Sequence, residues 1–341
     1  MAVTLHDVAQ RAGVSIKTVS NVVNGYAHVS PATRTKVEQV VAELGYRPNL
    51  AARNMRGGRS GVIALAVPEL GVPYFAELAQ SVIKAADREG FIVLIDQTEE
   101  RADRERLVLQ GIRSQLIDGL IYSPLALGSE DLADRTDTIP VVLLGERIAD
   151  TFDHVVIDNV TAARQAVAHL ADIGRTRIAA VGAQRSKSGE TAHLRLAGYR
   201  QGLAEAGLPY RDELVAETLS YHRHDGAAAM ARLLDSGARP DAVFAFSDLV
   251  ALGVLRCCYD RGIRVPEDVA VIGFDDLEEG RYAIPSLSTI SPDKDFIGRK
   301  AVELLANRLS RRASEGKDPA CGVIAPHRLE IRESTVGRGK R

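Results

Sequence analysis

The chain has 341 residues, of which 45% are hydrophobic and 26% are charged, so it is longer than one compact domain and has the composition of a folded globular protein. No run approaches the roughly 18 apolar residues of a transmembrane helix, and the N-terminus lacks the basic and apolar segments of a secretory signal. Three cysteines give neither a disulfide framework nor a metal-ligand spacing, so we expect a cytoplasmic protein without a bound metal.

The charge is unevenly distributed along the chain. Residues 1–60 hold eight Lys and Arg against three Asp and Glu, a net charge of +5, whereas the remaining 281 residues carry −7. A small basic head on an acidic body is typical of a polyanion-binding module attached to a second domain.

Three short helices are predicted in the head. Thr4 stands three residues before an acidic residue, as in an N-terminal capping box, and the helix that it begins ends at Gly13. Ser15 caps a second helix after a very short turn, and Ser30, followed by proline, begins a third that ends at Gly45. Two short helices joined by a tight turn and braced by a third have the geometry of a helix-turn-helix.

The polar face of the second predicted helix is suited to the major groove of DNA. Lys17 and Asn21 can donate hydrogen bonds to base edges, and Ile16 can contact a thymine methyl group. Thr18, Ser20 and the helix N-terminus can bind phosphates. A generic three-helix bundle would show an equally polar face, so this pattern alone leaves both interpretations open.

A longer signature runs through Val3–Ala9, Ala12–Ser15, Thr18–Asn24, Val29–Ser30 and Leu44–Tyr46. In this order and spacing it resembles the DNA-binding head of the lac-repressor (LacI/GalR) family of bacterial transcription regulators, and it covers residues 1–48. The resemblance implies that Ile16, Lys17 and Asn21 read bases. It also implies that the DNA backbone is contacted largely by Thr4, Ser15, Thr18, Ser20, Asn24, His28, Ser30, Thr33 and Tyr46.

Residues 49–60 are predicted to link the head to the body. The apolar segment from Asn49 to Met55 is too short to persist as an isolated helix in water, and two glycines separate it from the body. The family resemblance implies that it is a hinge helix, which pairs with that of a second protomer in the minor groove. Asn49 and Ala52 would contact the groove and Met55 would insert between base pairs, although leucine is usual at that position.

Short apolar runs alternate with helical patterns through residues 61–335, as expected for buried parallel strands. The predicted strands are Val62–Val67, Ile92–Ile95, Leu120–Tyr122, Val141–Leu144, Ile178–Val181, Leu214–Val215, Val243–Phe246 and Val269–Ile272. The repeated alternation predicts an α/β body with two lobes of doubly wound parallel sheet. Because neither a Gly-x-Gly-x-x-Gly fingerprint nor a P-loop is present, we expect no cofactor.

The segments Leu194–Tyr199 and Gly273–Asp276 resemble the periplasmic-binding-protein-like body of the same family. The resemblance implies an N-lobe of about 61–160 plus 291–322 and a C-lobe of about 161–290 plus 323–335. The basic chain end at 336–341 is predicted to be a disordered tail. No leucine heptads precede the tail, so a homodimer rather than a tetramer is expected.

The effector of such a fold binds between the lobes, at the carboxyl ends of the strands. Asp275 can accept hydrogen bonds from two hydroxyl groups, and Arg195 can donate a planar pair. Flat apolar faces for a ring are offered by Tyr74, Phe75 and Tyr221. Further polar candidates are Arg147, Asp158, Thr191 and Ser247, the last at a position where the family often has asparagine.

These features predict a dimeric, sequence-specific repressor on a pseudo-palindromic operator, controlled by an effector that is most simply a mono- or disaccharide. The alternative is a regulator of the same architecture with a purine or another metabolite as corepressor. A transporter's solute-binding protein would explain the body but not the basic head, and no catalytic set of residues indicates an enzyme.

Overall fold

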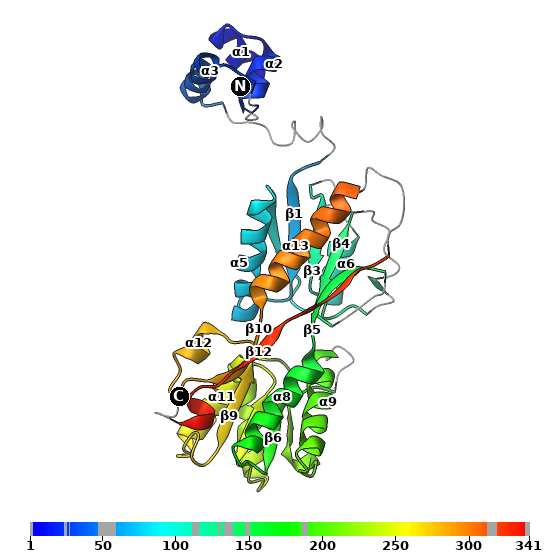
Figure 1. Ribbon diagram of the computed structural model, residues 1–341, viewed down its shortest axis with the longest axis vertical. Helices are drawn as coiled ribbons and strands as arrows, with labels where there is room; N and C mark the ends of the chain where they lie inside the picture. Colours follow the sequence, from blue (N-terminus) through cyan, green and yellow to red (C-terminus); the bar gives the residue numbers. More distant parts are fainter. Residues whose placement is uncertain are drawn as a thin grey trace. The chain divides into compact units, whose positions relative to one another are not determined.

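The computed structural model describes residues 3–23, 26, 28–46, 59–110, 116–128, 131–132, 139–146, 151–185, 190–311 and 319–337. The chain divides into two compact units, Met1–Ser60 and Gly61–Arg341 (Figure 1).

The described residues of the first unit form three helices, α1 (Leu5–Ala12), α2 (Ile16–Val23) and α3 (Pro31–Leu44). The capping box is formed as the sequence predicts, since Thr4 Oγ1 accepts from the Asp7 amide and the Asp7 carboxylate accepts from the Thr4 amide. Gly13 and Gly45 end α1 and α3 in the left-handed region, with φ of 61° and 63°. A small apolar core holds the helices together and consists of Val8, Ala9, Ala12, Val19, Val22, Val37, Val40 and Tyr46.

The second unit contains two six-stranded sheets, which confirms the predicted α/β class. The first sheet has the order β11-β5-β4-β3-β1-β2, and all its pairings are parallel. Its strands are β1 (Val62–Val67), β2 (Ile92–Gln97), β3 (Gly119–Tyr122), β4 (Val141–Leu144), β5 (Asp153–Ile157) and β11 (Gly322–Ala325).

The second sheet has the order β12-β10-β9-β8-β6-β7, and only its β10–β12 pairing is antiparallel. Its strands are β6 (Ile178–Ala183), β7 (Val215–Glu217), β8 (Ala242–Ala245), β9 (Ala270–Phe274), β10 (Ser288–Pro292) and β12 (His327–Glu330).

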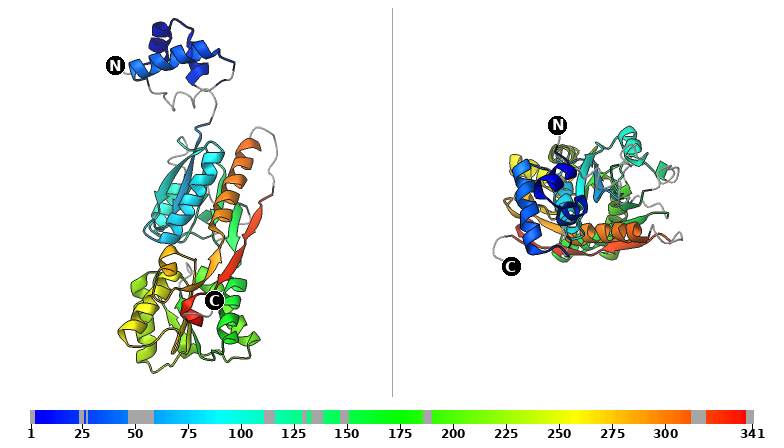
Figure 2. Two further views of the ribbon diagram at one scale, coloured as in Figure 1. Left: turned by 60° about the vertical axis from the view of Figure 1, so that its left-hand side comes forward. Right: turned by 90° about the horizontal axis from the view of Figure 1, so that it is seen from above.

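Helices cover both faces of each sheet (Figures 1 and 2). On the first sheet α5 packs against α13 on one face and α6 lies on the other, and on the second α8 packs against α9 and α10 against α11. These helices are α5 (Pro73–Arg88), α6 (Ala102–Leu109), α8 (Asn159–Asp172), α9 (Glu190–Glu205), α10 (Arg223–Asp235), α11 (Asp248–Asp260) and α13 (Lys294–Arg311). Short turns of helix form α12 (Glu278–Arg281), α14 (Glu333–Val336) and the 3-10 segment Asp212–Leu214.

The chain passes three times between the sheets, so each lobe is assembled from separate segments. The passages follow β5, β10 and β11, and the last lies at Pro326. We predicted crossings near 160, 291 and 323, so the last one is found a few residues later than expected.

The strands that were not predicted are β5, β10, β11 and β12. They belong to the segments that join the lobes, and β10 in particular reads Ser-Thr-Ile-Ser-Pro, a composition typical of a turn. The predicted strand at Leu214–Val215 is a 3-10 turn followed by β7.

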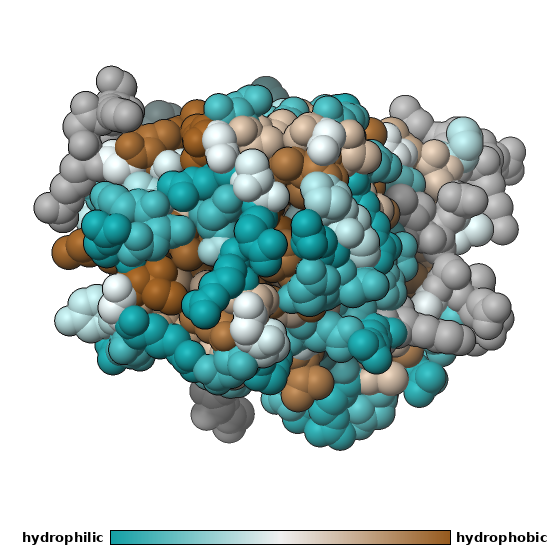
Figure 3. Space-filling model, turned by 90° about the horizontal axis from the view of Figure 1, so that it is seen from below, coloured by the Kyte–Doolittle hydropathy of each residue, from teal (hydrophilic) through white to brown (hydrophobic). Residues whose placement is uncertain are grey.

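We call the part of the body built on the first sheet the first lobe and the part built on the second sheet the second lobe. The end of the second lobe that faces away from the first is covered mainly by hydrophilic residues, with hydrophobic residues scattered between them (Figure 3). Within the described ranges, no helix combines the length and the apolar character needed to cross a bilayer.

The close approach of α10 to α11 depends on two glycines. A Cβ atom on Gly253 would lie 2.0 Å from the Arg223 carbonyl oxygen, and one on Gly226 would lie 2.2 Å from that of Val250. Because both obstacles are main-chain atoms, the helices themselves would have to separate.

Replacing Gly253 by Ala should therefore lower the free energy of unfolding by about 2 kcal/mol or more, as overpacking of a tight interior does. Urea denaturation of the full chain measures this effect. Gly128→Ala is the matched control, because a Cβ there meets no atom within 4 Å and should change stability by less than about 0.5 kcal/mol. Equal losses in the two variants would contradict the helix-packing explanation.

Candidate ligand cleft and nucleic-acid interface

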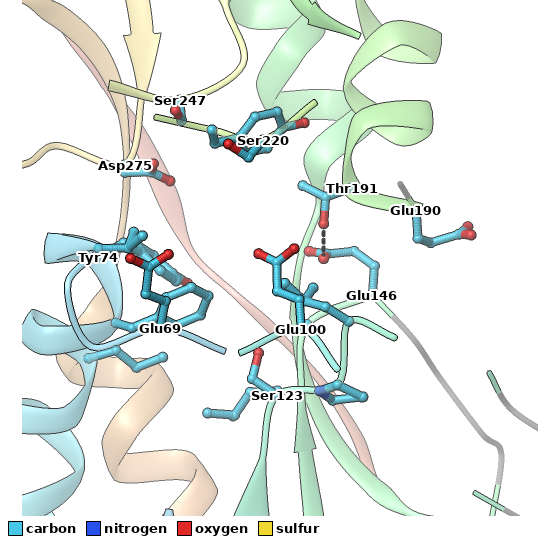
Figure 4. Close-up of a pocket in the computed structure, with 18 of the residues that line it drawn as sticks. Glu69, Tyr74, Glu100, Ser123, Glu146, Glu190, Thr191, Ser220, Ser247 and Asp275 are labelled. Atoms are coloured by element: carbon cyan, nitrogen blue, oxygen red, sulfur yellow. Dashed lines mark hydrogen bonds between the residues drawn. The ribbon is translucent and has the colours of Figure 1, made fainter. Parts of the chain in front are cut away.

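A cavity of about 380 Å³ lies between the two sheets of the second unit. Side chains reach it from both lobes, with Glu69 and Glu100 on one side and Ser220, Ser247 and Asp275 facing them (Figure 4). Seven of the nine predicted effector residues line it, namely Tyr74, Phe75, Thr191, Arg195, Tyr221, Ser247 and Asp275.

The other two predicted residues do not line the described cavity. Asp158 is the N-cap of α8, where its carboxylate accepts from the Thr161 amide at 2.9 Å. Arg147 lies outside the described residues.

Arg195 on α9 is the most firmly held of the predicted residues, with a relative exposure of 5%. Its Nε donates to Asn159 Oδ1 at 2.8 Å, its Nη1 donates to the Phe246 carbonyl, and its guanidinium carbon lies 3.5 Å from the centre of the Phe274 ring. No described residue accepts from Nη2, so one edge of a fixed guanidinium remains for a ligand.

Asp275 directly follows β9 and has a relative exposure of 8%. Its backbone φ of 121° lies outside the regions that most residues adopt, and Lys294 Nζ donates to its main-chain carbonyl at 2.5 Å. Burial raises the pKa of its carboxyl group to about 7, and the nearby Arg195 opposes that rise. A hydrogen bond from the Asp248 main-chain amide also favours the ionised carboxylate, and no described side chain donates to it, so it can still accept from a ligand.

Three aromatic rings supply apolar surface to the cavity. Tyr74 and Phe75, at the start of α5, meet edge to face with ring centres 5.3 Å apart. The Tyr221 hydroxyl group is buried and has no hydrogen-bond partner in the described part of the chain. Burial raises the pKa of Tyr221, so the group stays protonated and can donate to a ligand oxygen.

The two hydroxyl candidates already have partners. Ser247 Oγ caps α11 by accepting from the Val250 amide at 3.2 Å. Thr191 Oγ1 donates to Glu146 Oε2 at 2.7 Å, a hydrogen bond that joins the two lobes (Figure 4).

Glu146 and Asn159 form a polar link that sequence reasoning missed. Asn159 Nδ2 donates to Glu146 Oε1 at 2.5 Å, while Asn159 Oδ1 accepts from Arg195. A carboxylate of the first lobe thus holds the orientation of the guanidinium in the second.

Further polar residues of the lining were also not predicted; with Glu146 they are Glu69, Glu100, Ser123, Gln184, Glu190, Ser220 and His222. All but Glu190 and His222 lie within three residues of the end of a parallel strand. The rule that ligands bind at the carboxyl ends of parallel strands would have found them, had it been applied to every strand.

In the head, the residues predicted to read bases lie on α2. Ile16, with 42% exposure, and Lys17 are exposed, and Asn21 is half-buried. Ser15 Oγ accepts from the Thr18 amide at 3.0 Å, so this hydroxyl group caps α2.

The residues predicted to contact the DNA backbone lie in different environments. Thr4, Ser15, His28 and Ser30 are exposed, whereas Thr18, Ser20 and Thr33 are half-buried. Tyr46 packs into the apolar core with 9% exposure, which leaves little of its surface for DNA. Asn24, Asn49, Ala52 and Met55 lie outside the described residues.

Comparison with known families assigns both parts of the chain. Residues 4–49 match the family described as bacterial regulatory proteins, lacI family, and residues 167–335 match the periplasmic binding protein-like domain. The HTH-type transcriptional regulator DegA of Bacillus subtilis is 34% identical over 342 residues, which cover 98% of both chains.

Two solved structures extend this similarity to the fold. The lac repressor dimer bound to operator and the anti-inducer ONPF is 29% identical, with a TM-score of 0.84 over 98% of this chain and 99% of that one. A complex of the transcriptional regulator CelR with cellobiose is 33% identical, with a TM-score of 0.72 over 97% and 99%.

Asp275 should make the stability of the unliganded protein depend on pH. Its carboxyl pKa is higher in the folded than in the unfolded chain, so the folded state binds more protons between about pH 4 and pH 7 and loses stability as the pH rises through that range. Asp275→Asn removes this loss and keeps a residue that tolerates positive φ.

We expect Asp275→Asn to raise the free energy of unfolding relative to wild type by at least about 1 kcal/mol more at pH 8 than at pH 5. Urea denaturation without ligand at the two pH values measures the difference. An effect that is independent of pH would show that this carboxyl group does not titrate between pH 5 and pH 8 in the folded protein.

Proposed function

We infer that this chain, which belongs to the lacI family of bacterial regulatory proteins, is a repressor whose hold on operator DNA is controlled by a saccharide bound in the cleft. The buried pair Arg195 and Asp275 carries this proposal, since among the described residues nothing accepts from Arg195 Nη2 and no side chain donates a hydrogen bond to the Asp275 carboxylate.

A saccharide matches the chemistry of the cavity. Its hydroxyl groups can both donate to Asp275 and accept from Arg195 and Tyr221, and its ring faces can pack on the aromatic side chains. The related regulator CelR binds cellobiose, which supports this class of ligand. The further polar candidates Thr191 and Ser247 would contact the ligand only through hydroxyl groups that already have hydrogen-bond partners in the protein.

For the head, we propose that α2 enters the major groove and that Ile16, Lys17 and Asn21 contact base edges. We also propose that Asn49, Ala52 and Met55 act in the adjoining minor groove. The exposure of Ile16 and Lys17 on one helix supports the first assignment.

We propose a homodimer, because a pseudo-palindromic operator requires two heads. The lac repressor is a dimer in its operator complex. Apolar side chains of β2 that stay exposed in one copy, among them Ile92 and Leu94 at 51% and 44%, suit such an interface.

Effector control would act through the angle between the lobes. The bonds that join them across the cleft include Thr191 to Glu146 and His222 to Glu69, the latter at 3.4 Å. A ligand that bridges Asp275 and the first lobe would favour one angle over others, and the two heads of a dimer would change their spacing.

The test is a thermal-unfolding screen of the full chain with cellobiose, glucose, cellobiose 6-phosphate and hypoxanthine, followed by DNA-binding titrations with each stabilising compound. A duplex selected by the wild-type protein from random-sequence DNA serves as the operator. We expect an uncharged sugar to stabilise the protein and to weaken DNA binding at least tenfold. Stabilisation by hypoxanthine with tighter DNA binding would instead establish the corepressor alternative.

Lys17→Ala should weaken binding to the selected duplex at least tenfold, because it removes a donor to base edges. The matched control is Lys36→Ala, which removes the same charge from the exposed surface of α3 and should change affinity less than about threefold. Fluorescence anisotropy measures both affinities. If both variants bind equally weakly, Lys17 contributes charge only and does not read a base.

A further inference from the structure

The loop that follows β3 forms one wall of the cavity, to which it contributes Ser123, Pro124, Leu125 and Ala126. Strand β3 ends at Tyr122, and Ser123 is still fixed to the sheet by a hydrogen bond from its amide to the Ala66 carbonyl. Pro124 has no amide N–H, and the next three amides are those of Leu125, Ala126 and Leu127.

These amides are directed instead at a single side chain, Glu105 on α6. Its Oε1 accepts from the amides of Leu125 and Ala126, both at 3.0 Å, and its Oε2 accepts from Ala126 at 3.1 Å and Leu127 at 2.8 Å. Glu105 is completely buried, with a relative exposure of 0%.

Successive main-chain N–H groups that converge on one point form a concave site for an anion. In many proteins such a site binds a phosphate group of a ligand. Here the anion belongs to the protein, and its hydrogen bonds are of the charge-assisted kind, which offset the cost of burying the carboxylate. Without Glu105, three successive amides would lose their acceptor, that of Leu127 in a buried position and those of Leu125 and Ala126 in a partly buried one.

The orientation of the loop has a consequence for ligand chemistry. Because these amides are turned toward Glu105, they are not available to a ligand, and Pro124, Leu125 and Ala126 present apolar surface to the cavity. An uncharged ring can pack against such a wall, whereas a phosphate group would lose its water without gaining donors.

We propose that Glu105 is a positioning residue whose carboxylate occupies the anion site formed by the amides of residues 125–127. It thereby holds this wall of the cavity in place for an uncharged sugar ring and excludes phosphorylated ligands. The proposal rests on the proposed function in so far as it concerns sugars. The occupation of the amide site by Glu105 can be tested independently of it.

The experiment uses Glu105→Ala in the full chain, with calorimetric titration of cellobiose and cellobiose 6-phosphate and with operator binding measured without sugar. We expect cellobiose to bind at least tenfold more weakly, and operator affinity to stay unchanged. Sodium formate should restore cellobiose binding by placing a carboxylate in the vacated site, whereas sodium chloride at equal ionic strength should not. The phosphorylated sugar should gain affinity in the variant without formate.

Asp103→Ala is the matched control, since Asp103 is an exposed carboxylate on the same helix that pairs with Arg101 at 2.7 Å. It should leave cellobiose affinity unchanged, with or without formate. A folded Glu105→Ala protein that binds cellobiose as wild type does, or that formate does not restore, would overturn the proposal.

Hydrogen exchange of the amides of residues 125–127 separates this inference from the proposed function. In the wild-type protein without sugar they should exchange slowly; in Glu105→Ala they should exchange at least a hundredfold faster, and formate should slow them again. Fast exchange in the wild type would overturn the proposal even if cellobiose binds. If cellobiose fails to bind the wild type while exchange behaves as expected, the saccharide assignment is wrong and the role of Glu105 in holding the loop stands. Should Glu105→Ala not fold, Glu105→Gln, which keeps the side-chain size and removes the charge, replaces it in the sugar-binding and hydrogen-exchange measurements without formate; unchanged sugar affinity and unchanged exchange in this variant would overturn the proposal.

Discussion

The carboxyl ends of two parallel sheets face one another across one cavity, and the rest of the body depends on this arrangement. It arises because the chain crosses between the sheets three times, so that neither lobe is a continuous segment. Strand ends from distant parts of the sequence therefore deliver side chains to the same space: Glu69 and Glu146 come from one sheet, and Ser220 and Asp275 come from the other. Apolar side chains buried between sheet and helix fix the strand positions, which leaves the strand ends free to vary in chemistry.

The buried charges of the cleft have unequal support. Arg195 is held by Asn159, by a main-chain carbonyl and by the Phe274 ring, whereas the Asp275 carboxylate has no comparable set of donors. A buried carboxylate with few donors destabilises the folded state, and a ligand hydroxyl group would supply a further donor. The same residue that lowers the stability of the empty protein thus increases the gain on binding, as expected where stability and function compete at a site.

The sequence predicted the three described helices of the head because their signals are local. Capping residues and glycines mark the helix ends within three or four positions, and the structure forms the capping box at Thr4 and the left-handed ends at Gly13 and Gly45. The body was predicted where strands are apolar throughout, as in β1 and β4, and missed where strands join the lobes, as in β10, whose burial depends on partners far away in sequence. The cleft shows the same division. Asp275 and Arg195 were found from the segments that resemble the family, but Glu146 and Asn159 were not, because their role is to hold Arg195 and only the fold brings them to it.

The contacts across the cleft differ in kind from those within each lobe, and this difference bears on regulation. Within a lobe, helices pack on sheets through buried apolar side chains and, between α10 and α11, through glycines that allow main-chain contact. Across the mouth of the cleft the lobes are joined by polar bonds such as Thr191 to Glu146 and by the half-exposed pair of His222 and Glu69. Partly exposed ion pairs contribute little, because water competes for both partners. A ligand that adds a few hydrogen bonds on both sides of the cleft can therefore select the angle between the lobes. Rigidity inside each lobe makes that selection useful, since a change at the cleft then reaches the far end of the lobe without being absorbed by rearrangement of the core.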